Sequence, residues 1–269
     1  MFEPSEKGKA LSGETILHHH RLISSIFSTA VEWGVLFSNP CDRTKPPKVK
    51  NKEPKYLDEV QATVLLELLE QESITHRTIV QLLLFTGMRR GEILGLKWAD
   101  VDFNNSTMQI SRSLQYLPDR GLFEDETKNK TSNRIIKLPQ TAVITLQGYK
   151  VQQLERRLKV GDKWENSDYI FTNEFGKPIN PDTLSSWFSK FVKANADKLP
   201  YITLHSLRHT NATLQIAGGV PITTVAKRLG HTNSNTTGKI YAHAIKSADE
   251  VAAETLENLL ASPKNKNVG

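Results

Sequence analysis

The chain has 269 residues, a length that favours two domains, and 38% of them are hydrophobic, which excludes wholesale disorder. Its 35 Lys and Arg residues exceed its 29 Asp and Glu residues, and the net charge of +6 favours a polyanionic partner. Cys41 is the single cysteine, which excludes an intrachain disulfide and a thiolate metal cluster. No apolar run approaches the roughly 20 residues that span a bilayer, and no signal-peptide core is present. We therefore expect a soluble intracellular protein whose partner is nucleic acid and not a membrane.

The first predicted element is a helix over residues 12–37, in which apolar residues recur at helical spacing. Residues 44–55 follow with three prolines and five lysines, so they are neither helical throughout nor buried. This basic stretch predicts a linker between one domain at 1–43 and another at 56–269. Its lysines fit either contact with a phosphate backbone or a plain solvated tether.

From residue 56 onward the pattern is mostly helical. Predicted helices begin after Asp58, a helix-capping residue, and then lie at about 76–85, 91–98, 141–158, 182–195, 204–216, 222–229 and 248–260. Residues 107–117 and 134–138 are rich in β-forming side chains, and the turn-forming Gly121 lies between them. The expected fold class is therefore mainly α with a small antiparallel β-sheet (α+β).

Three segments combine Arg, His and Tyr side chains, and they cover residues 86–98, 204–210 and 229–243. In the second segment His205 and Arg208 are three residues apart, so a helix places them on one face. The segments lack a carboxylate cluster. Such a set suits a phosphodiester substrate, because catalysis there consists of holding negative charge and moving protons.

Each of these residues, taken singly, also has a structural explanation. A helical histidine is more often a surface or core residue, Tyr241 fits a packed aromatic side chain, and Gly87 fits a helix C-cap. The histidines at 18–20 point about 100° apart on a helix, so they predict surface and half-buried side chains and not a metal site. The combination and the spacing carry the functional interpretation.

Together the three segments resemble the active-site motifs of the tyrosine recombinases, or phage integrase family, over about residues 56–260. In that family a lysine also lies in a β-hairpin between the first two motifs. The matching residues are Arg89 and Glu92 after Thr-Gly-Met, Lys128 in the segment 127–139, His205 and Arg208 as His-x-x-Arg, His231 in Leu-Gly-His, and Tyr241.

The resemblance implies a site-specific recombinase that integrates and excises a mobile element by cutting and rejoining DNA. Tyr241 attacks the scissile phosphate to form a 3′-phosphotyrosine. A free phenol has a pKa of about 10 and is mostly protonated at pH 7, so the attack needs a base, and His205 takes this role. No cofactor and no metal ion are implied. The other implied roles are phosphate binding by Arg89, Arg208 and His231, protonation of the leaving 5′ oxygen by Lys128, and support of this machinery by Glu92.

The same resemblance implies double-stranded DNA with recombination sites as the partner, on the bacterial nucleoid in the cytoplasm. It also implies a homotetramer on DNA, a monomer free in solution, and accessory DNA-bending or excision factors. Residues 1–43 match only the last helices of a core-binding domain, which predicts an N-terminally truncated integrase of a phage or conjugative transposon. The helix at 248–260 is expected to dock on a neighbouring protomer or on its own domain.

Other function classes remain open at this stage. A type IB topoisomerase uses much the same catalytic set to relax supercoils, and a chromosome-dimer-resolving recombinase shares the chemistry at a different kind of site. A DNA-binding protein without catalysis would lack one of the reactive groups, and none is missing. A metal-dependent nuclease would need clustered carboxylates and would be inhibited by EDTA.

Overall fold

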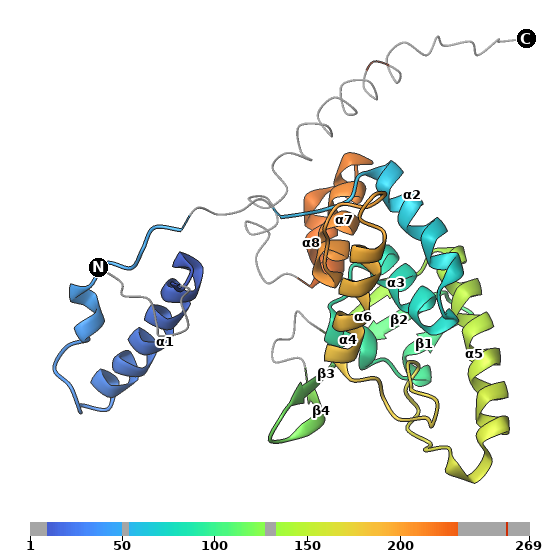
Figure 1. Ribbon diagram of the computed structural model, residues 1–269, viewed down its shortest axis with the longest axis horizontal. Helices are drawn as coiled ribbons and strands as arrows, with labels where there is room; N and C mark the ends of the chain where they lie inside the picture. The colour runs from blue at the N-terminus through green and yellow to red at the C-terminus, as the bar shows by residue number, and fades with distance from the viewer. Residues whose placement is uncertain (1–9, 50–53, 127–132, 231–256, 258–269) are drawn as a thin grey trace, which may run out of the picture. The chain divides into compact units, whose positions relative to one another are not determined.

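A computed structural model of the chain describes residues 10–49, 54–126, 133–230 and 257 (Figure 1). Apart from residue 257, the predicted helix at 248–260 lies outside the described residues. The chain divides between residues 53 and 54 into two compact units, called unit 1 and unit 2 below. This division falls within the stretch 44–55. None of the described helices combines the length and the apolar character that crossing a membrane requires.

Unit 1 contains the helix α1 (Gly13–Glu32) and, after it, the short 3-10 helix η1 (Pro40–Arg43). The predicted helix over 12–37 was too long at its C-terminal end. Gly34 adopts a φ of 70°, and its N–H and that of Val35 bond back to carbonyls of the last turn of α1. Asn39 then donates from Nδ2 to the carbonyl of Ser24 at 2.9 Å, which holds the segment before η1 against α1.

Helices enclose the apolar core of unit 2, and α3 runs through its centre, in contact with both α5 and α7. Asp58, Ser73 and Asn180 cap α2, α3 and α6 by accepting backbone N–H groups of the first turn. The elements are α2 (Glu59–Leu68), η2 (Leu69–Gln71), α3 (Ile74–Thr86), α4 (Arg90–Leu94), η3 (Trp98–Asp100), α5 (Gln140–Val160), η4 (Gly161–Lys163), α6 (Pro181–Ala194), α7 (Leu204–Ala217) and α8 (Ile222–Leu229).

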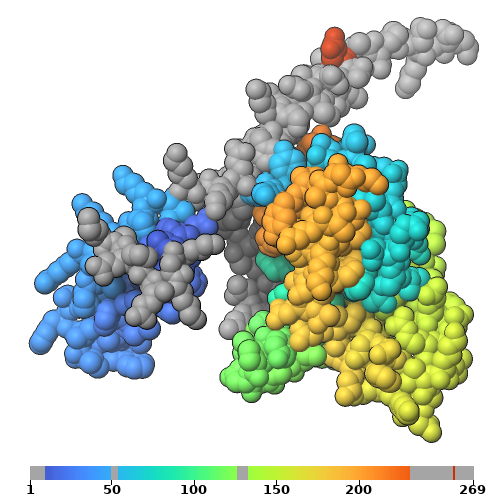
Figure 2. Space-filling view, in the orientation of Figure 1, coloured from blue at the N-terminus to red at the C-terminus, as the bar shows by residue number. Residues whose placement is uncertain are grey.

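The described strands of unit 2 form two small antiparallel sheets. One has the order β1-β2-β5, from β1 (Val101–Asp102), β2 (Thr107–Ile110) and β5 (Arg134–Lys137), with Met108 opposite Ile136. The other is a hairpin of β3 (Arg112–Leu117) and β4 (Gly121–Glu126), which projects from the body of unit 2 (Figures 1 and 2). The mainly α fold with antiparallel β-structure is confirmed. The β-rich segment 107–117 is not one strand, because the chain leaves the first sheet at Ser111.

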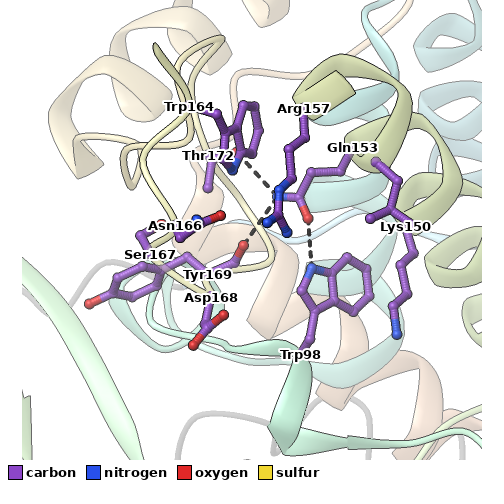
Figure 3. Close-up of a pocket in the computed structure, with 11 residues that line it drawn as sticks. Trp98, Lys150, Gln153, Arg157, Trp164, Asn166, Ser167, Asp168, Tyr169 and Thr172 are labelled. Atoms are coloured by element: carbon purple, nitrogen blue, oxygen red, sulfur yellow. Dashed lines mark hydrogen bonds between the residues drawn. The ribbon is translucent and has the colours of Figure 1, made fainter. Parts of the chain in front are cut away.

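The predicted helix at 91–98 is too long at its C-terminal end, since α4 ends at Leu94. Beyond it the chain is extended, because Leu96 accepts the N–H of Ile170 and Trp98 donates to the carbonyl of Asp168. Figure 3 shows side chains around these two paired segments, among them Trp98, Gln153 and Asp168. The indole of Trp98 donates to Oε1 of Gln153 at 2.6 Å, and Nε2 of Gln153 donates to the carbonyl of Ile170 at 2.8 Å. A buried glutamine on α5 thus holds both segments, and tertiary pairing replaces the last turn of the predicted helix.

Candidate active site

The predicted site residues within the described part of the chain lie on two helices of unit 2. Arg89 and Glu92 lie at the start of α4, and His205 and Arg208 lie in the first half of α7. In Figure 1, α7 and α8 lie side by side, and α4 follows the central helix α3. Lys128, His231 and Tyr241 lie outside the described residues.

Arg208, in the second segment, binds the N-terminal ends of the first and third segments. Its guanidinium is buried. It donates from Nη1 to the carbonyl of Gly87 at 2.7 Å and from Nη2 to the carbonyl of Leu229 at 2.8 Å. Gly87 is the C-cap of α3, two residues before Arg89, and Leu229 is the last residue of α8, two residues before His231. Helix C-terminal carbonyls lack partners within the helix and carry partial negative charge, so they suit a guanidinium. Arg208 therefore brings the first and third segments to its own helix.

Arg89 reaches from the buried base of the site to its surface. Glu92 accepts the backbone N–H of Arg89 on Oε2 at 2.9 Å and the Nη1 of the same arginine on Oε1 at 2.8 Å. The Glu92 side chain is only 3% exposed, whereas that of Arg89 is 42% exposed. The carboxylate thus caps α4 and aims a guanidinium that is accessible to an anion. Glu92 therefore positions Arg89.

A pocket of about 570 Å³ opens beside these residues. Arg89 and His205 both line it, with Ser113 from the hairpin and Tyr201 from the loop before α7. Cationic and hydroxyl groups along an open hollow of this size can take a segment of sugar-phosphate backbone. In the described ranges, no group of three or more His, Cys, Asp or Glu side chains is placed to hold a metal ion.

The histidines of α7 are electrostatically suited to be neutral. Burial lowers the pKa of His205, and the nearby charges of Arg208 and Arg89 lower it further. The ring of His209 meets that of His205 edge-on at 4.8 Å between centroids. Burial, followed by the charges of His205 and Arg208, lowers the pKa of His209 to about 4. A neutral imidazole at His205 can accept a proton at pH 7, as a general base must.

One buried residue of this network lies outside the three sequence segments. Arg134, the first residue of β5, donates from Nη2 to Oε2 of Glu92 at 2.8 Å and from Nη1 to Oε1 at 3.2 Å. Its Nε donates to the carbonyl of Arg228 at 2.8 Å. Burial alone raises the pKa of Glu92, but the hydrogen bonds and charges of Arg134 and Arg89 outweigh burial and hold this pKa below its ordinary value. A signal existed, because strand alternation puts Arg134 on the same inward face as Ile136.

Gly87 should tolerate no side chain, although it caps α3 as many glycines do. Its φ is 65°, and an added Cβ would lie 2.3 Å from Cδ2 of Leu229 and 2.7 Å from Oδ1 of Asn211. Gly87→Ala should therefore cost about 2–4 kcal/mol of unfolding free energy, from left-handed strain and from overpacking together. Urea unfolding measures this loss. Gly121→Ala is the matched control, because Gly121 has a φ of 74° but open space around it. Equal losses in the two variants would contradict a close approach of α3, α7 and α8.

Acid should destabilise the protein partly through His209. Its pKa of about 4 in the folded chain lies below the ordinary 6.5, so between these values the unfolded chain binds a proton that the folded chain does not. Stability contributed by the neutral imidazole is thus complete above pH 6.5 and is lost as the pH falls toward 4. We expect His209→Gln to show a smaller drop in Tm between pH 7.5 and pH 5 than the wild type. An identical drop in both proteins would disprove this assignment.

The chain is similar to known recombinases and integrases. The family model described as "Phage integrase family" matches residues 55–248. A "Tyrosine recombinase XerC-like" of Caldanaerobacter subterraneus subsp. tengcongensis is 32% identical, over 94% of this chain and 68% of its own length. The "ICEBs1 integrase" of Bacillus subtilis is 30% identical, over 93% of this chain and 67% of its own.

The fold comparison points the same way. A solved structure of the Tn1549 transposon integrase with transposon right end DNA superposes with a TM-score of 0.76, at 24% identity, over 93% of this chain and 82% of that chain. At that identity the likeness concerns the fold alone. The sequence matches are stronger evidence, since they span the three motifs. The chain belongs to the phage integrase family, and it is a tyrosine recombinase.

Proposed function

We propose that this site-specific recombinase integrates and excises a mobile element, with Tyr241 as its nucleophile on double-stranded DNA. The observation that carries the proposal is the convergence on Arg208. One buried guanidinium holds the carbonyls of Gly87 and Leu229, so the segments that lead to Arg89 and to His231 meet at the helix of His205. The Tn1549 integrase was solved with transposon DNA, and the net charge of +6 of this chain suits the same partner.

The chemistry follows from the charges at the site. Arg89, which is exposed beside the pocket, and the buried Arg208 together bind the non-bridging oxygens of the scissile phosphate. Neutral His205 accepts the proton of the Tyr241 phenol as the phenolate attacks phosphorus. The bond to the 5′ oxygen breaks, and Lys128 protonates that oxygen. His231 donates a further hydrogen bond to the phosphate.

The 3′-phosphotyrosine conserves the energy of the phosphodiester. A 5′-hydroxyl of the partner strand attacks it, the phenolate leaves, and the same groups carry the protons back. The reaction therefore needs no nucleotide and no metal ion.

Exchange between two duplexes requires paired sites, so we propose a homotetramer on DNA that forms from free monomers. Residues 248–260, nearly all of which lie outside the described residues, are expected to dock on a neighbouring protomer or on their own domain, and accessory DNA-bending or excision factors are further partners that we propose. The place of action is then the bacterial nucleoid.

The test is covalent capture from a pool of duplexes with random sequence around a single nick. When a strand is cut close to the nick, the short fragment diffuses away and the protein remains attached to DNA. We expect an adduct that survives SDS and forms in EDTA, and sequencing of its DNA defines the captured duplex. Absence of an adduct, or an adduct that requires Mg²⁺, would contradict the proposal. A captured duplex that supports relaxation of one plasmid, but no exchange between two, would indicate a topoisomerase.

Arg89→Lys should separate transition-state stabilisation from DNA binding. Lysine keeps the charge but loses the planar fork, so single-turnover cleavage should fall by about 10²–10³. Affinity and its salt dependence should change little, because the number of neutralised phosphates is the same. Arg90→Lys is the matched control, since Arg90 lines the same pocket and pairs with Asp182 at 3.1 Å. Equal losses of cleavage and affinity in Arg89→Lys would make Arg89 an ordinary phosphate contact.

A further inference from the structure

Arg134 occupies the junction between the sheet, α4 and the end of α8. Its side chain is 6% exposed, and it makes a double hydrogen bond to Glu92, a residue 42 positions earlier in the chain. Ion pairs as buried as this one are costly to desolvate and need specific partners to persist. The core alone would be better served by an apolar side chain, which points to a role for the charge.

The charges of this cluster do not cancel. Glu92 contributes one negative charge and accepts from two guanidiniums, Arg89 at 2.8 Å and Arg134 at 2.8 Å. The sum for the three side chains is +1. Without Arg134 the sum would be zero, and Arg89 would present a neutralised ion pair to an incoming phosphodiester. In a partly buried site this difference of one charge changes the attraction for a phosphodiester strongly, because the effective dielectric constant is low.

Arg134 also contacts the segment that leads toward His231. Its Nε donates to the carbonyl of Arg228, and Nη2 of Arg228 donates to the carbonyl of Lys137 at 2.9 Å, so β5 and the end of α8 exchange two bonds. Gly230 follows with a φ of 70°, and an added Cβ there would lie 2.9 Å from Nη1 of Arg134. The guanidinium is therefore packed closely against the chain one residue before His231.

We propose that Arg134 is a positioning residue of the recombinase: it offsets and orients Glu92, so that Arg89 meets the scissile phosphate with its positive charge uncompensated. This inference rests on the proposed function, because it assigns Arg89 to the phosphate. Arg134 acts through Glu92 and does not touch the DNA. The same guanidinium anchors the end of α8 to β5, which fixes the third segment relative to the first.

The test is a charge cycle in single-turnover cleavage of the captured duplex. Arg134→Gln takes the cluster sum from +1 to zero, and cleavage should fall by about 10²-fold, the effect of losing one group that stabilises transition-state charge. Arg134→Gln combined with Glu92→Gln returns the sum to +1, and we expect the rate to recover by at least about 10-fold. Arg134→Lys keeps the charge without the fork and should cleave faster than Arg134→Gln.

If the role of Arg134 were purely structural, the cleavage rate of the double variant would not recover. Loss of both partners would then leave cleavage as slow as in Arg134→Gln, or slower, and this outcome overturns the proposal. Thermal unfolding and DNA affinity are measured beside the rates, so that rates are compared only among folded proteins. If Arg134→Gln does not fold, Arg134→Lys decides: a loss of 10²-fold or more despite the retained charge overturns the electrostatic role.

Arg112→Gln is the matched control. Arg112 is a partly buried arginine of the β-structure, and its ion pairs join Asp100 and Glu124, not Glu92. Its loss should lower the Tm and leave the cleavage rate unchanged. The wild-type adduct separates failure of the proposed function from failure of the role of Arg134. No wild-type adduct means that the proposed function fails, whereas a wild-type adduct with unimpaired cleavage by Arg134→Gln means that only the role of Arg134 fails.

Discussion

Tyr241→Phe should abolish the covalent protein–DNA adduct and leave DNA affinity nearly unchanged. The substitution removes only the hydroxyl that attacks phosphorus, so no phosphotyrosine bond can form at residue 241. Affinity depends on many contacts with phosphates along the duplex, and the phenol contributes at most one of them. Incubation of the captured duplex with each protein, followed by SDS electrophoresis, measures the adduct. A gel-shift titration measures affinity in the same buffer.

Tyr201→Phe is the control for this experiment. Tyr201 lines the pocket with Arg89 and His205, and it is 54% exposed, so it is the described tyrosine best placed to be mistaken for the nucleophile. We expect Tyr201→Phe to form the adduct at the wild-type rate. Adduct formation by Tyr241→Phe together with its loss in Tyr201→Phe would move the nucleophile to the loop before α7.

Lys128→Ala should slow cleavage by about 10²–10⁴, the range for one positioned proton transfer. Without a general acid, the 5′ oxygen must leave as an alkoxide, which is a poor leaving group. A duplex with sulfur in place of the bridging 5′ oxygen has a good leaving group and needs no acid. The defect of Lys128→Ala should therefore largely vanish on the sulfur substrate, as single-turnover rates on both duplexes would show.

Lys130→Ala is the control, since Lys130 lies in the same lysine-rich segment. It should cleave the oxygen substrate normally and gain nothing from sulfur. If Lys130→Ala shows the sulfur-dependent rescue and Lys128→Ala does not, Lys130 is the general acid. A defect that sulfur fails to rescue in either variant would mean that these lysines contact DNA without transferring a proton.

Several parts of the fold could be predicted because their causes are local in the chain. Asp58, Ser73 and Asn180 cap helices within three residues of themselves, and apolar spacing marks the faces that those helices bury. The pairing of Arg89 with Glu92 is of the same kind, since the two residues are three apart. Motif order and spacing also identified the family, and they named catalytic candidates whose roles await the experiments above.

The remaining features depend on segments far apart in the sequence. Local periodicity does not reveal these partners. The chain breaks at Ser111 because β2 pairs with β5 whereas β3 pairs with β4. The helix α4 ends at Leu94 because the next residues pair with the segment of Asp168 and Ile170. A buried charge likewise shows its need for a partner but not the partner's identity, as Arg134 and Glu92 illustrate.

The sequence by itself therefore determined the type of each long helix, the family and the set of reactive side chains. Only the tertiary structure decided that Arg208 binds the carbonyls of Gly87 and Leu229, and that Arg134 shares Glu92 with Arg89. The physical reason is that propensity, capping and spacing act within a few residues. The electrostatic environment of a catalytic group, in contrast, is the sum over every charge and carbonyl that folding brings near it.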